Sequence, residues 1–205
     1  MKQFVNDKIT KRQKNYYLLF YFMIYYKKDV IKWLLNLPNI DVNIQNQYND
    51  SPLHIAINIK NTEIINLLLN HQNINVNLQN EDDNTPLHLA MYINNNEIIN
   101  LLLNHQNINV NLQNTFSYTP LHISIYNNNT EIFNLLINYP NINVNLQNKN
   151  GNTPLHIAID KKYYGFIKEL IHKTDLTINN NNLHSILSLY CSIIINTKIM
   201  SNNVK

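Results

Sequence analysis

The sequence predicts an all-α fold in which units of 34 residues stack into a solenoid. A tetrad of Ser or Thr followed by Pro-Leu-His occurs four times at a constant interval of 34 residues. Residues 63–80 and 97–114 are identical, and apolar residues recur at helical spacing between the tetrads. A fixed period of this size is typical of stacked repeats, whose units bury their apolar faces only against their neighbours. The tetrads begin at Ser51, Thr85, Thr119 and Thr153.

Each unit is expected to contain two short helices. Thr85 is a suitable N-cap and Pro86 suits the first helical position, so a helix begins there and ends near Asn94. A second helix is expected over 96–104, apolar on nearly all sides and therefore buried on more than one face. Residues 108–112 alternate between apolar and polar side chains, which predicts a short extended segment.

The same register extends beyond the four tetrads. The apolar run 16–26 aligns with a first helix and predicts a degenerate leading repeat, while residues 183–195 predict a closing helix. The expected organisation is a single domain over 13–196 with repeats at 13–46, 47–80, 81–114, 115–148 and 149–182, a C-terminal cap at 183–196, and tails at 1–12 and 197–205.

Composition and charge limit the function. The chain is rich in asparagine, with 43 Asn among 205 residues, and its single cysteine, Cys191, favours a reducing intracellular setting such as the cytoplasm of its own cell or of a host cell. Residues 61–148 contain six acidic residues and no Lys or Arg, between two basic ends. A nucleic-acid groove needs a continuous basic track, so no nucleic-acid partner is expected. The apolar run 16–26 is too short to span a bilayer, and no membrane partner is expected.

The tetrads, together with an Ala two residues after three of the histidines (Ala56, Ala90 and Ala158), resemble the ankyrin repeat. The resemblance covers residues 16–195. It implies helix-turn-helix units with short β-hairpin-like finger loops, about five repeats plus a closing helix. It also implies a structural role for the tetrad histidines, whose rings would bond the tetrad Ser or Thr and the neighbouring turn.

Two departures from this family's pattern are visible. The unit is one residue longer than the usual period, with the insertion near Gln72, Gln106 and Pro140. The Gly that usually closes the first helix is replaced at Lys60, Asn94, Asn128 and Lys162.

No residue pattern predicts chemistry. Tetrad histidines of adjacent repeats are expected to lie about 8–10 Å apart, too far to share a metal ion. No nucleophile motif occurs, and two Gly in the whole chain do not suffice for a phosphate-binding loop. We therefore expect no catalytic residue, no cofactor and no metal, and no enzyme activity.

The resemblance places partner binding on the concave face, formed by the finger loops and the exposed side of the first helices. Exposed aromatic side chains are typical hot spots of interfaces, whereas the alternative is that these rings pack on neighbouring turns. With the acidic middle, they predict a partner protein with a basic and apolar surface. The expected contact residues are Tyr48, Asp50, Glu81, Asp82, Tyr92, Thr115, Phe116, Tyr118, Tyr126 and Lys149.

The function predicted from these residues is that of a monomeric, non-enzymatic adaptor. One alternative is a scaffold or spacer. Another is a substrate of an asparaginyl hydroxylase, because Asn43 has Leu35 eight residues before it and Asp41 two before it. In ankyrin repeats this context favours the modification. The competing interpretation of Asn43 is a side chain that bonds the backbone of the turn.

Overall fold

The computed structural model describes residues 11–25 and 27–174 of the chain. The predicted cap at 183–196, Cys191, the C-terminal tail and residues 1–10 of the N-terminal tail lie outside the described residues.

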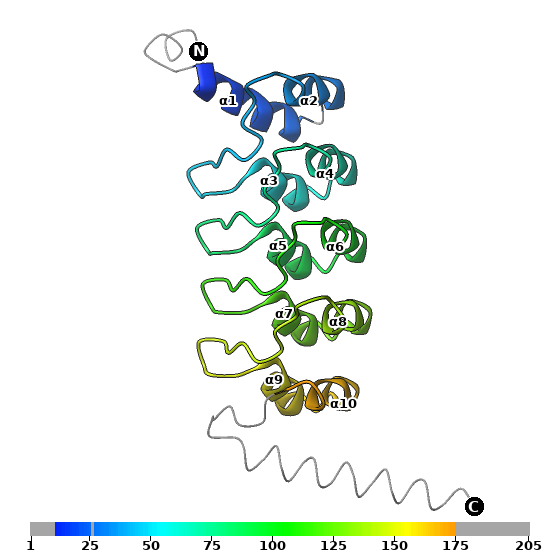
Figure 1. The fold of residues 1–205 in the computed structure, drawn as a ribbon. Helices are drawn as coiled ribbons and strands as arrows, with labels where there is room; N and C mark the ends of the chain where they lie inside the picture. Colours follow the sequence, from blue (N-terminus) through cyan, green and yellow to red (C-terminus); the bar gives the residue numbers. More distant parts are fainter. Residues whose placement is uncertain (1–10, 26, 175–205) are drawn as a thin grey trace, which may run out of the picture. The chain divides into compact units, whose positions relative to one another are not determined.

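The described residues form ten α-helices in five pairs and contain no strand, which confirms the all-α class. The helices of each pair are joined by a short turn, and longer loops join successive pairs (Figure 1). The pairs are α1 (Lys11–Ile24) with α2 (Lys28–Leu35), α3 (Pro52–Asn58) with α4 (Thr62–Leu69), α5 (Pro86–Tyr92) with α6 (Asn96–Leu103), α7 (Pro120–Tyr126) with α8 (Thr130–Ile137), and α9 (Pro154–Asp160) with α10 (Tyr164–Ile171).

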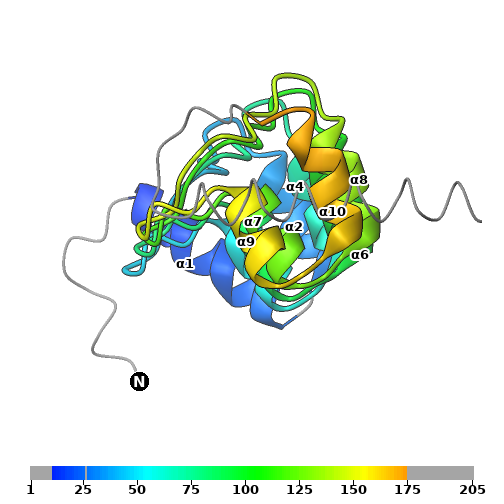
Figure 2. The same ribbon diagram turned by 90° about the horizontal axis from the view of Figure 1, so that it is seen from below.

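The chain divides into two units, Met1–Thr115 with helices α1 to α6 and Phe116–Lys205 with helices α7 to α10. In the first unit α3 packs on α5, and α4 packs on α6. In the second unit α7 packs on α9 and α8 packs on α10. Within each unit the first helices therefore form one column and the second helices another, with the finger loops projecting on the side of the first helices (Figures 1 and 2).

The tetrad starts α3, α5, α7 and α9 as predicted. Thr85 is the N-cap of α5, its side chain accepts the His88 N–H, and Pro86 occupies the first turn. Beyond the other end, Asn94 has a left-handed backbone with φ of 49°. This conformation closes a helix and is usually taken by Gly, because a side chain makes it less favourable. The replacements expected at the closing position all adopt it: Lys60, Asn94, Asn128 and Lys162 have φ between 49° and 58°.

Among the described residues, both helices of each pair supply apolar side chains to the core, and the second helices supply slightly more of them than the first. In α6, Ile98, Ile99, Leu102 and Leu103 are buried, and the helix packs on both α5 and α4. In the second unit Phe133 of α8 stacks on Phe166 of α10, with ring centroids 4.3 Å apart. Helices of eight residues are unstable alone, so this packing between repeats is what maintains them.

The connection after the second helix differs from the expectation. Residues 108–112 are not extended throughout, because a turn at 110–111 interrupts them. Asparagine side chains accept the backbone donors that a strand would pair: the Asn111 N–H bonds Asn109 Oδ1 at 3.0 Å. The finger loops themselves are hairpin-like, with the Asn80 N–H donating to the Asn84 carbonyl at 3.0 Å.

Asparagine side chains also link one repeat to the next. Asn77 Nδ2 donates to the Asn107 carbonyl at 2.7 Å, and Asn77 Oδ1 accepts the Asn109 N–H at 2.9 Å. An amide can donate and accept at once, so one side chain satisfies two backbone groups of its neighbour. The asparagine content of the repeats therefore has a structural use.

The leading repeat is present as predicted. Helix α1 covers most of the apolar run 16–26, and its Leu19 and Met23 are fully buried. Across the described stretch of chain, no helix has the length and apolar character needed to cross a bilayer.

Candidate functional site

Each tetrad histidine accepts the backbone N–H of its own tetrad Ser or Thr through Nδ1, and His54 and His122 also bond the next finger through Nε2. In His54, Nδ1 accepts the Ser51 N–H at 3.1 Å, and Nε2 lies 2.9 Å from the carbonyl oxygen of Asn84 in the next finger. Since a backbone N–H can only donate, Nδ1 is unprotonated and Nε2–H donates to Asn84. His122 repeats the arrangement with Thr119 at 3.1 Å and the Asn152 carbonyl at 3.2 Å.

Burial keeps these rings neutral. Desolvation lowers the pKa of His54, opposed by the hydrogen bond to the Asn84 carbonyl and by the charge of Asp50. Desolvation lowers the pKa of His122 to about 4, again opposed by a hydrogen bond to a backbone carbonyl. The structural role expected for the tetrad histidines is confirmed at these two positions. In the described residues no three His, Cys, Asp or Glu side chains converge on a metal position.

The predicted contact residues of the first unit lie on the fingers and on α5. Tyr48 is exposed at the tip of its finger, as are Glu81 and Asp82 on the next one, and Tyr92 is exposed at the end of α5. The backbone links these fingers, because the Glu81 N–H donates to the Tyr48 carbonyl at 3.0 Å. The fingers of this unit are thus held at fixed spacing.

Two predicted residues of the first unit are engaged within the fold. Asp50 is half-buried, and its Oδ1 accepts a hydrogen bond from Asn80 Nδ2 at 2.9 Å. Thr115 is also half-buried, and its N–H donates to the Asp82 carbonyl at 2.9 Å. Asp50 and Thr115 therefore stabilise the finger loops, and these polar groups are already bonded within the fold.

In the second unit three predicted aromatic residues form one cluster. The ring centroids of Phe116 and Tyr118 are 6.4 Å apart, and those of Tyr118 and Tyr126 are 5.2 Å apart. Phe116 is 60% exposed and Tyr126 is 41% exposed, whereas Tyr118 is half-buried against the ring of His122. Lys149 is exposed on the next finger, and its N–H donates to the Phe116 carbonyl at 3.2 Å.

The Tyr126 hydroxyl is neutral at physiological pH. Desolvation together with the hydrogen bond and charge of Tyr118, 3.2 Å away, and the charge of Asp160 raises the pKa of Tyr126 to about 12. The hydroxyl therefore acts as a hydrogen-bonding group and not as an ionic one.

Sequence reasoning missed Lys161, whose Nζ lies 5.1 Å from the centroid of the Tyr126 ring. A cation over an aromatic face is attracted by the electron density of the ring. The signal was available, because Tyr126 is aligned with Asp160 in the next repeat, directly before Lys161. The aromatic cluster of the second unit thus has basic neighbours, unlike the acidic fingers of the first unit.

Asn43 lies in the loop of the leading repeat and is half-buried. Its Nδ2 donates to the Asn73 carbonyl at 2.7 Å, and its Oδ1 accepts the Asn75 N–H at 2.8 Å. Hydroxylation at Asn43 stays a prediction, and an enzyme would have to detach both hydrogen bonds first. If this alternative holds, protein isolated from its source cells carries one added oxygen on the peptide that contains Asn43. An unmodified peptide in mass spectrometry would contradict this.

Comparison with known proteins agrees with the repeat geometry. The family model described as "Ankyrin repeats (3 copies)" matches residues 18–114 and 92–182. No curated protein sequence gives a significant match to the chain. The matched residues include all four tetrads and both helices of each complete repeat. The chain belongs to the ankyrin-repeat family, whose repeats generally act as protein–protein interaction modules and typically carry no enzyme activity.

Proposed function

We propose that this chain is a non-enzymatic adaptor that binds a partner protein through its finger loops and the exposed ends of its first helices. The observation that supports it best is the cluster of Phe116, Tyr118 and Tyr126, in which two large rings are exposed and the third supports them. Aromatic rings that are already ordered lose little conformational entropy on binding, and they supply much of the contact energy of interfaces.

The charge around the cluster indicates the chemistry of the partner. The second finger of the first unit exposes Glu81, Asp82 and Asp83, while Lys149 and Lys161 lie beside the cluster of the second unit. We propose that the partner offers basic residues to the first unit and apolar anchors to the second. Complementary charges of this kind set the specificity and the rate of association more than the affinity.

Alanine substitution of Phe116 and of Tyr126 tests the proposal. With the full chain as bait in source-cell extract, each substitution is expected to weaken capture of the partner about tenfold, since a hot-spot ring contributes more than 1 kcal/mol. Tyr118 is not a suitable target because it packs on His122, so its loss would also disturb the fold. Capture is measured by quantitative mass spectrometry of the retained proteins.

Tyr164→Ala is the matched control. Tyr164 is 58% exposed in the same unit but belongs to α10, a second helix. Equal capture by all three variants would contradict the finger surface. If the chain retains no protein in any form, the alternative of a scaffold or spacer is favoured instead.

A further inference from the structure

The two units differ in whether a side chain donates a hydrogen bond to the last carbonyl of a second helix. In the second unit, Lys173 Nζ donates to the Ile137 carbonyl at 2.7 Å and lies 3.3 Å from Asn138 Oδ1. Ile137 is the last residue of α8 and Asn138 is its C-cap. The ammonium group therefore satisfies a carbonyl that the helix leaves without a partner, at the negative end of the helix dipole.

In the first unit, histidines stand at the position of Lys173. By the 34-residue register, His71 and His105 correspond to Lys173. Each ring bonds its own loop, because Nδ1 of His71 accepts the Asn73 N–H at 3.2 Å and Nδ1 of His105 accepts the Asn107 N–H at 3.3 Å. Within the described part of the chain, no donor reaches the carbonyl oxygens of Leu35 or Leu69, which end α2 and α4 as Ile137 ends α8.

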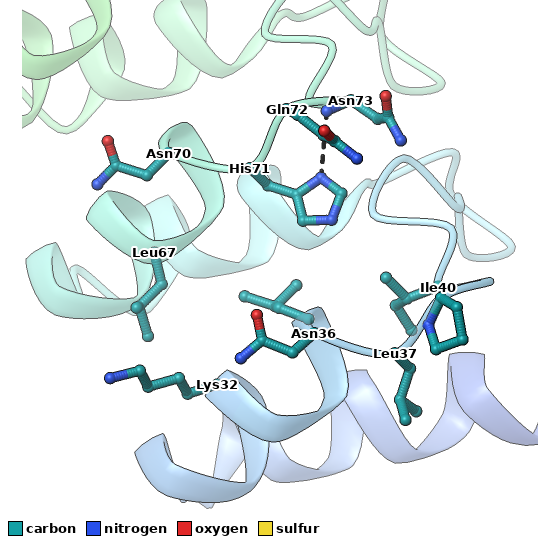
Figure 3. Close-up of a pocket in the computed structure, with 11 residues that line it drawn as sticks. Lys32, Asn36, Leu37, Ile40, Leu67, Asn70, His71, Gln72 and Asn73 are labelled. Carbon is teal, nitrogen blue, oxygen red and sulfur yellow. Dashed lines mark hydrogen bonds between the residues drawn. The ribbon is translucent and has the colours of Figure 1, made fainter.

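An open groove lies at each of these helix ends. The groove at the end of α2 has a volume of about 490 Å³ and is bounded by Leu35, Asn36 and His71 (Figure 3). The groove at the end of α4 has a volume of about 390 Å³ and is bounded by Leu69, Asn70 and His105. Both contain the loop positions near Gln72 and Gln106 where the unit is one residue longer than usual.

We propose that these two grooves bind lysine side chains from a basic segment of a partner protein. Each groove offers the contact that Lys173 makes within the chain, a carbonyl at the end of a helix beside an asparagine side chain. Residues 61–115 contain no Lys or Arg, so a cation meets little electrostatic repulsion at the groove of α4. The groove of α2 also contains Lys32, which lies beneath Leu67 in Figure 3, and binds less tightly for this reason.

The spacing of the grooves specifies the partner segment further. Packed repeats are separated by about 8–10 Å. A polyproline II segment advances about 3.1 Å per residue with three residues per turn, so every third side chain lies on one face about 9 Å from the last. A segment with lysine at every third residue therefore fits both grooves at once. This surface lies at the ends of the second helices and does not depend on the proposed finger surface.

Titration of the isotope-labelled full chain with an acetylated peptide of three Lys-Pro-Pro triplets tests this inference. The amide NMR signals of Asn70 to Asn73 and of Asn104 to Asn107 are expected to shift. A matching Gln-Pro-Pro peptide should leave these signals in place because it carries no ammonium group. Shifts confined to the acidic fingertip, Glu81 to Asp83, would show non-specific attraction and overturn the proposal.

Exchanging the residues at the register position gives the decisive controls. His105→Lys is expected to fill the groove of α4 from within and to weaken peptide binding there about tenfold, since a hydrogen bond to a charged group is lost. Lys173→His is expected to release the Ile137 carbonyl and produce a new peptide site at 137–139. Undiminished binding to the folded His105→Lys protein, or no new site in Lys173→His, would contradict the assignment. His71→Lys provides the same test at the groove of α2 if either variant fails to fold.

Discussion

Replacement of Phe133 by alanine is expected to lower the free energy of unfolding by about 3–5 kcal/mol. The Phe133 side chain is fully buried in α8, and its ring stacks on Phe166 of α10 with centroids 4.3 Å apart. The change removes the apolar contacts of this ring with α10 and leaves a cavity between the two repeats. Because each helix is too short to be stable alone, loss of this contact weakens α8 and α10 together. Urea unfolding followed by circular dichroism measures the effect.

The control for this substitution lies on the same helix. Leu135 is 43% exposed, so Leu135→Ala removes little buried surface and is expected to change the free energy of unfolding by less than about 1 kcal/mol. Equal losses from the two substitutions would show that packing between the second helices does not stabilise the unit.

Acidification is expected to destabilise the protein through its buried histidines. In the folded state the pKa of His122 is about 4, against 6.5 for an ordinary histidine. Below pH 6.5 the unfolded chain binds a proton that the folded chain does not, so stability is complete above this pH and decreases as pH falls towards 4. At pH 5 the loss from His122 alone is about 2 kcal/mol. His54 adds to it in the same direction, since its pKa is also lowered.

Urea unfolding at pH 7.5 and pH 5.0 measures this difference. His122→Gln is expected to be less stable at pH 7.5, because the ring bonds Thr119 and the Asn152 carbonyl, but to lose less on acidification. His172→Gln, which changes an exposed histidine, is expected to keep the wild-type difference between the two pH values. The explanation is wrong if His122→Gln loses as much stability between these pH values as the wild type.

The repeats were predictable because their signals are local and recur. A Thr at the N-cap and a Pro in the first turn favour the start of a helix through contacts within a few residues, and four copies in register repeat that evidence. The prediction of an extended segment at 108–112 was wrong in part, because a turn at 110–111 interrupts it. Its alternation is real, but asparagine side chains accept the N–H groups that a strand would pair, and this competition is not visible in a hydrophobic pattern.

By itself the sequence determined the repeat length, the helix pairs and the left-handed closing positions, because each depends on residues at fixed separations. The resemblance to the ankyrin repeat implied the role of His54 and His122. Only the tertiary structure decided that Tyr118 is half-buried while Phe116 is exposed, and that Lys161 covers the ring of Tyr126. It also showed that Lys173 bonds the last carbonyl of α8, whereas His71 and His105 do not bond the corresponding carbonyls of α2 and α4. These contacts join side chains of neighbouring loops and repeats. Their outcome depends on side-chain length and direction at one place in space, which no periodic pattern records.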